Sequence, residues 1–166
     1  VQTYLGGNPS NASPALTITV DATADAPTGL DLADEDDTGV SSADDITSRT
    51  AGLTISGEAE DGATVQLYDG PIPVGAAVAV IEGVFSAEIS LIGGAHSLTA
   101  VQTDRAGNIS SASDALVITV DSVIDAPSEL RLAADDDNGS YRADNITNQT
   151  TELTISGAAK NNATVQ

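Results

Sequence analysis

The chain has 166 residues, of which 25 are acidic and 5 are basic, so its formal net charge at pH 7 is −20. It lacks cysteine, which excludes a disulfide framework and a thiolate metal site. A chain this acidic is repelled by nucleic acid and by anionic surfaces. It has no apolar run near the ~18 residues of a membrane span, and it does not open with the pattern of a signal peptide. We therefore expect neither nucleic-acid binding nor direct membrane insertion.

Short runs of alternating apolar and polar residues succeed one another along the chain, as expected for half-buried strands. In chain order, strands are expected around Leu30 and Leu32, and then at 53–57, 64–70, 76–83, 85–91, 96–104 and 115–121. Gly, Asp and Asn residues typical of turns separate these runs. About seven short strands in about 100 residues predict an all-β fold, the immunoglobulin-like β-sandwich.

The sequence repeats itself at an offset of 100 residues without a gap. VQTYLGGNPSNASPALTITVD (1–21) matches VQTDRAGNISSASDALVITVD (101–121), and LTISG occurs at both 53–57 and 153–157. Such a repeat predicts tandem domains arranged end to end. We expect residues 1–21 to be the C-terminal strands of a preceding repeat, 22–121 a complete repeat, and 122–166 the N-terminal part of a following one. We interpret the chain as a window from a longer array.

The acidic residues gather in two windows one period apart. Residues 21–45 hold nine carboxylates and residues 121–144 hold seven, which together are 16 of the 25. The first window contains the long connection 33–47, and long ordered connections are usually functional. Asp21, Asp25, Asp36, Asp37 and Asp44 all recur 100 residues later, as Asp121, Asp125, Asp136, Asp137 and Asp144.

An up-and-down order of seven strands places these acidic segments in space. The long connection and Asp121 should lie where the chain leaves the repeat, and the connection 103–108 should lie beside the incoming linker 21–25. Clustered carboxylates repel by ~1 kcal/mol per pair in water. Ca²⁺ relieves this repulsion, because it accepts 6–8 oxygen ligands from Asp, Asn and carbonyl groups. The alternative is that these aspartates are ordinary turn residues on a solvated acidic surface.

A weaker local pattern is the spacing of an EF-hand loop, which adds Asp34 and Asp45 as candidates. The later copy has Ala134 and Asn145 at these positions, and no helix is expected on either side.

The runs ITVD-x₃-DAP, DDTG-x₄-D-x-IT, LTISG-x-A-x₃-ATV and TDRAGNIS-x-AS-x-AL-x-ITVD resemble the bacterial Ig-like repeats of giant surface adhesins. These are the biofilm-associated and RTX-type adhesins exported by type I secretion. The resemblance implies an extracellular, non-catalytic extender module at the bacterial cell surface. Calcium at junctions with neighbouring repeats of the same chain would stiffen the string, and no small-molecule substrate is expected.

By position, the resemblance implies a calcium region made of Asp21, Asp25, Asp36, Asp37, Asp44, Asp104, Asp121 and Asp125. Asn108 and the equivalents Asp136, Asp137 and Asp144 are further candidates. Tyr4 departs from the pattern, because it stands where the complete repeat has Asp104.

Two other functions stay open on the sequence. One is a module that binds a glycan or a host protein, against which the scarcity of aromatic side chains counts. The other is an accessory domain of a secreted enzyme. No enzymatic activity is expected of this chain itself, since it has one histidine (His96), no Ser-His-Asp spacing and no G-x-S-x-G.

Overall fold

The computed structural model describes residues 1–3, 5–161 and 163–166, and the described part is all β. Its strands are β1 (Thr28–Leu32), β2 (Ile46–Thr47), β3 (Ala51–Glu58), β4 (Thr64–Asp69), β5 (Ile72–Ala79), β6 (Val84–Ser90), β7 (Gly94–Thr103), β8 (Leu116–Val120), β9 (Ser128–Leu132) and β10 (Ile155–Ala158). Among the described residues, no helix has the length and apolar character needed to cross a membrane.

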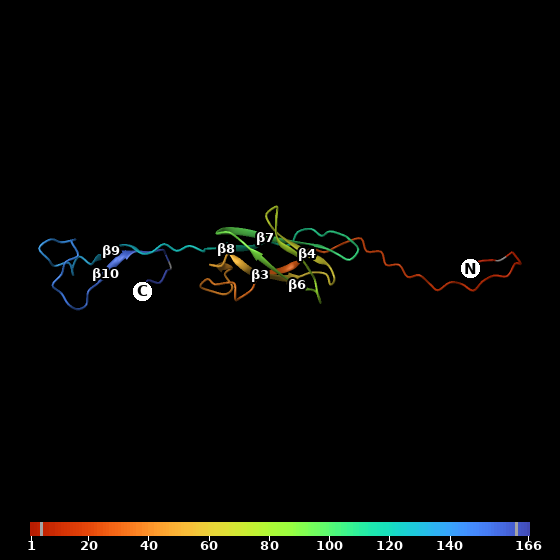
Figure 1. The fold of residues 1–166 in the computed structure, drawn as a ribbon, viewed down its shortest axis with the longest axis horizontal. Helices are drawn as coiled ribbons and strands as arrows, with labels where there is room; N and C mark the ends of the chain where they lie inside the picture. Colours follow the sequence, from red (N-terminus) through yellow and green to blue (C-terminus); the bar gives the residue numbers. More distant parts are fainter. Residues whose placement is uncertain (4, 162) are drawn as a thin grey trace. The chain divides into compact units, whose positions relative to one another are not determined.

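The first eight strands form a β-sandwich (Figure 1). One sheet has the order β1-β3-β6 and the other has the order β2-β8-β7-β4-β5. Side chains alternate between the two faces of a strand. On β6 this alternation buries Phe85, Ala87 and Ile89, while Ser86 and Glu88 face solvent. The predicted alternation is confirmed on β3, β4, β6 and β8, whereas β5 contains no buried residue. The all-β immunoglobulin-like fold is confirmed.

Two strands differ from the expectation. The strand expected at 76–83 is β5, which begins at Ile72 because the turn at Gly70 pairs Asp69 directly with Ile72. Gly70 has a φ of 56°, a conformation that glycine adopts without strain. Part of the long connection is also a strand, since β2 pairs in parallel with β8 and places Ile46 opposite Thr119. Two residues are too few for an alternating pattern to reveal.

Contacts divide the chain into two compact units. Unit 1 is made of Val1–Asp31, Thr54–Ile89 and Ser97–Leu116, and unit 2 is made of Leu32–Leu53, Ser90–His96 and Val117–Gln166. Unit 1 thus contains the linker 21–25 and the connection 104–108. Unit 2 contains the long connection after β1, the linker 121–125 and the antiparallel pair β9–β10, in which Ile155 lies opposite Leu132.

The segment before β1 has the sequence of a strand but does not form one. Apart from an isolated bridge between Thr3 and Pro9, its described residues lie outside any strand. Leu16, Ile18 and Val20 are exposed. A strand needs neighbours to satisfy its backbone hydrogen-bonding groups, and no strand of the described part pairs with residues 16–20.

Candidate functional site

In unit 1, a buried glutamine holds the linker that leads into β1. The alternation of β7 directs Leu98, Ala100 and Gln102 inward, and Gln102 is only 1% exposed. Its side-chain amide donates to the Asp25 carbonyl oxygen at 2.5 Å and accepts the Glu60 N–H at 2.9 Å. Glu60 Oε1 accepts the Asp25 N–H at 2.7 Å and the Gln102 amide at 3.1 Å. The linker, the segment after β3 and the end of β7 therefore form one closed hydrogen-bond network.

The connection after β7 joins the same linker through Asn108. The Asp104 carboxylate accepts the Asn108 N–H at 2.8 Å on Oδ1 and the Asn108 side-chain amide at 2.7 Å on Oδ2. That amide also donates to the Asp21 carbonyl oxygen at 3.2 Å. The side-chain hydrogen bond from Asn108 is the main cause that lowers the pKa of Asp104, against the effect of burial. The predicted placement of this connection beside the linker is confirmed.

This arrangement fits a hard cation by its donor chemistry. The Asn108 amide nitrogen lies between the Asp104 carboxylate and the Asp21 carbonyl oxygen and donates to both. A cation bound by these oxygens would require the amide to rotate, so that its own oxygen replaces the nitrogen as a ligand. Within the described parts of the chain, no group of three or more Asp, Glu or His side chains could hold a metal ion. An ion here would therefore need carbonyl and amide oxygens as well, which Ca²⁺ accepts.

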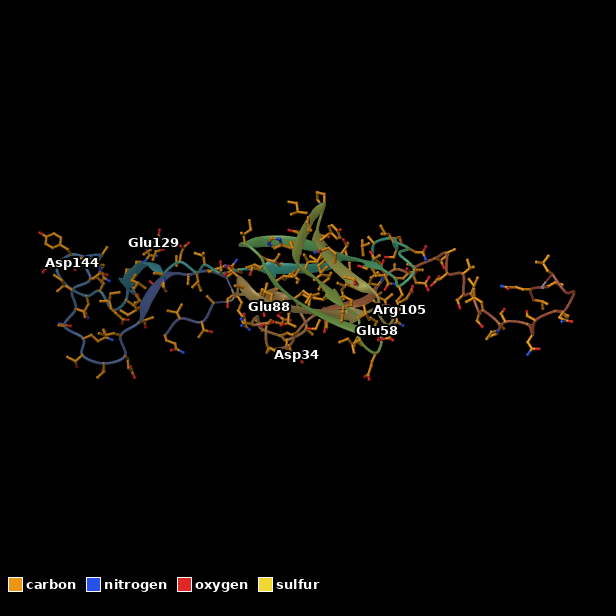
Figure 2. The ribbon with its side chains drawn as sticks, turned by 45° about the vertical axis from the view of Figure 1, so that its right-hand side comes forward. Asp34, Glu58, Glu88, Arg105, Glu129 and Asp144 are labelled. Atoms are coloured by element: carbon orange, nitrogen blue, oxygen red, sulfur yellow. The ribbon has the colours of Figure 1, made fainter. Side chains whose placement is uncertain are left out.

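The other candidates of this linker are open to solvent. Asp21 and Asp25 are both exposed. The Asp21 carboxylate accepts the Thr23 N–H at 3.4 Å. Arg105, labelled in Figure 2, lies on the neighbouring connection, and its side chain packs against Gly62. A Cβ atom on residue 62 would lie only 2.7 Å from the Arg105 Nε atom.

In unit 2, Asp37 organises the long connection. It is 6% exposed, and its Oδ2 accepts the N–H groups of Asp44 and Asp45, each at 3.0 Å. Its Oδ1 accepts the Ile46 N–H at 3.2 Å, and Asp44 Oδ1 accepts the same N–H at 3.2 Å. These bonds turn the chain so that β2 can reach β8. Backbone N–H groups thus contact both oxygens of the Asp37 carboxylate without a metal.

Asp36 is also engaged by the protein itself. It is 2% exposed and forms an ion pair with the Arg49 guanidinium, which also donates to the Glu35 carbonyl oxygen at 3.4 Å. In the later copy, the Gln149 amide donates to Asp136 at 3.2 Å. The residue 13 positions further along the chain thus contacts this aspartate in both copies.

The remaining candidate ligands are either turn residues with contacts inside the protein or side chains exposed to solvent. The later copy makes similar but not identical turn contacts. Asp137 Oδ2 accepts the N–H groups of Ala143 and Asn145, Asp137 Oδ1 is buried without a hydrogen-bond partner among the described residues, and Asp144 accepts the N–H of Ile146. Asp34 and Asp125 are exposed, and the EF-hand spacing lies between two strands, β1 and β2. Tyr4 lies outside the described residues.

Asp121 lies where the strand order predicted. Its N–H donates to the Thr47 carbonyl oxygen at 2.8 Å, so the linker 121–125 starts beside the end of the long connection. Its carboxylate forms an ion pair with Lys160. For all of these residues, the role of calcium ligand stays a prediction. The contacts of Asp36, Asp37 and Asp44 are those of turn residues.

Sequence reasoning missed four residues that make these contacts, namely Arg49, Glu60, Gln102 and Lys160. A signal existed for three of them. Gln102 is a polar residue at an inward position of an alternating strand, and Arg49 is a rare basic residue directly after the acidic connection. Lys160 replaces Glu60 at the same position of the repeat.

The β-sandwich of a three-stranded and a five-stranded sheet defines the class of this chain as an immunoglobulin-like β-sandwich module. The family model described as "Bacterial Ig-like domain" matches residues 23–122, so the chain belongs to the bacterial Ig-like domain family. No curated protein matches the sequence.

Among solved structures, the chain is similar to a fibronectin(III)-like module structure of Clostridium thermocellum CbhA. The identity is 18% and the TM-score is 0.42, and the match covers 80% of this chain. The chain spans 64% of that structure's length.

Proposed function

We propose that this chain is an extender module of a bacterial cell-surface adhesin, stiffened by Ca²⁺ at the junctions between neighbouring Ig-like repeats. Membership of the bacterial Ig-like family supports a non-catalytic module. The 100-residue internal repeat supports a string of such modules. The resemblance of its motifs to type I-secreted adhesins supports export to the cell surface and a role in adhesion or biofilm formation.

The observation that carries the calcium part is the position of Asn108. Its side-chain amide connects the Asp104 carboxylate on one connection with the Asp21 carbonyl oxygen on the linker. An ion held by these groups and by the Asn108 amide oxygen would tie the linker to the sandwich. It would also offset the charge of the Asp104 carboxylate, which accepts both hydrogen bonds from Asn108.

Stiffening by such an ion follows from mass action. A cation that binds the folded form alone contributes about 2.7 kcal/mol to its stability when free Ca²⁺ is about 100 times Kd. Extracellular calcium modules have Kd values on the order of 10⁻⁴–10⁻³ M. For a repeat of this size, that stabilisation raises the melting temperature by about 10–20 °C.

The experiment compares thermal unfolding of the full chain in EDTA, in CaCl₂ and in MgCl₂ at one ionic strength. We expect Ca²⁺ to raise the melting temperature more than Mg²⁺ does. Asp104→Asn should remove most of that rise, whereas Glu88→Gln, on the solvent face of β6, should retain it. A melting temperature that responds equally to both cations, or to neither, would refute the calcium proposal.

A further inference from the structure

Two equivalent segments of the repeat, 58–61 and 158–161, carry opposite net charges, and each contacts the linker that begins its own repeat, 21–25 or 121–125. The segment after β3 carries three carboxylates, Glu58, Glu60 and Asp61, for a charge of −3. One period later the same positions hold Ala158, Lys160 and Asn161, for a charge of +1. The second segment is therefore four charges more positive than the first, although the surrounding motif is the same.

Each of these segments contacts its own linker. Glu60 Oε1 accepts the Asp25 N–H at 2.7 Å, whereas the Lys160 ammonium forms an ion pair with the Asp121 carboxylate. The side chains of Lys160 and Asp121 are 49% and 45% exposed, so salt and metal ions in solution reach both. At the second linker a protein cation thus takes part in contacts where the first linker has a carboxylate.

The residues between the linker aspartates differ as well. The first linker has Ala-Thr-Ala at 22–24, and the second has Ser-Val-Ile at 122–124. Val123 and Ile124 line a hollow in unit 2 together with Val40, Ile46 and Lys160. The oxygen-bearing side chains of this hollow are Ser48, Asp121, Ser122 and Asn161, and Lys160 lines the hollow together with them.

We propose that Lys160 is a built-in counter-ion that replaces calcium at the linker 121–125. The array would then contain two kinds of junction. One kind depends on calcium and has Glu at the position of residue 60, and the other kind has a lysine at that position, as Lys160, which supplies the cation. The calcium-dependent kind of junction rests on the proposed calcium function, whereas the ion pair between Lys160 and Asp121 is independent of it. Repulsion between an ammonium and a divalent ion about 5 Å away in water weakens binding more than about tenfold.

The experiment follows the backbone amides of the ¹⁵N-labelled full chain by NMR during titration with CaCl₂ at constant ionic strength. In the wild-type chain, we expect saturable shifts at 21–25 and 104–108. The sequence contains no counterparts of Asp104 and Asn108 for the linker 121–125, so the effect of a cation at this position of the repeat is tested at the linker 21–25. Glu60→Lys, which copies the later repeat, should weaken the response at 21–25 more than about tenfold. Glu60→Gln retains the acceptor for the Asp25 N–H and should weaken the calcium response at 21–25 less than Glu60→Lys does. Glu58→Ala, which also copies the later repeat, is the matched surface control.

A second measurement needs no calcium. In EDTA, Lys160→Glu should lower the heteronuclear NOE of the amides at 121–125, and Lys160→Arg should leave it unchanged. If this result is obtained and no amide responds to Ca²⁺, the proposed calcium function fails while Lys160 still restrains the linker. Saturable wild-type shifts at 121–125 with the affinity seen at 21–25 would overturn the inference. So would Lys160→Glu leaving the NOE of that linker unaltered.

Discussion

Replacement of Gln102 by Met should destabilise the sandwich more than its conservative volume suggests. The side chain is 1% exposed and makes three hydrogen bonds, to the Asp25 carbonyl oxygen, to Glu60 Oε1 and from the Glu60 N–H. Each bond contributes about 1 kcal/mol, so their loss costs about 3 kcal/mol. For a repeat of about 100 residues, this cost lowers the melting temperature by about 12–24 °C.

Circular dichroism during thermal and urea unfolding in EDTA measures this loss without any contribution from calcium. Gln66→Met on β4 is the matched control. The Gln66 amide donates to the carbonyl oxygens of Leu67 and Val74 at 2.9 and 3.0 Å, but the side chain is half-buried and water can replace both bonds. We expect a cost below about 1 kcal/mol for the control. The reasoning is wrong if Gln102→Met costs no more than Gln66→Met.

Two further predictions concern the aspartates. Asp37→Ala removes the acceptor of three backbone N–H groups, so we expect it to lower the free energy of unfolding, measured by urea denaturation, by about 2–4 kcal/mol. Asp34 is exposed, and Asp34→Ala should change that free energy by no more than about 0.5 kcal/mol. Equal losses of stability in the two variants would contradict the turn role of Asp37. The pKa of Asp104 is lowered in the folded chain, so its contribution to stability should be complete above about pH 4 and be lost as pH falls through the folded pKa. Carboxyl NMR titration should give a midpoint below 3.8, and Asn108→Ala should raise it; an unchanged midpoint would show that Asn108 is not the cause.

The candidate site was only partly predictable from the sequence. Strand order and alternation correctly placed the connection 103–108 beside the linker 21–25, and Asp121 beside the long connection. The sequence could not distinguish a carboxylate that is available to bind a cation from one that is already bound by backbone N–H groups or by a basic side chain of the protein. Asp37 accepts N–H groups from residues seven to nine positions further along the chain, and such contacts exist only once the connection has folded.

The sequence by itself determined the period of the repeat and the inward faces of β3, β4, β6 and β8. Alternation alone identifies Leu116, Ile118 and Val120 as one face, and the structure buries all three. The corresponding Leu16, Ile18 and Val20 have the same pattern but are exposed. Only the tertiary structure decides between these two fates. The backbone of β8 is hydrogen-bonded between β2 and β7. Among the described residues, no strand lies beside residues 16–20 to pair with them or to cover their apolar face.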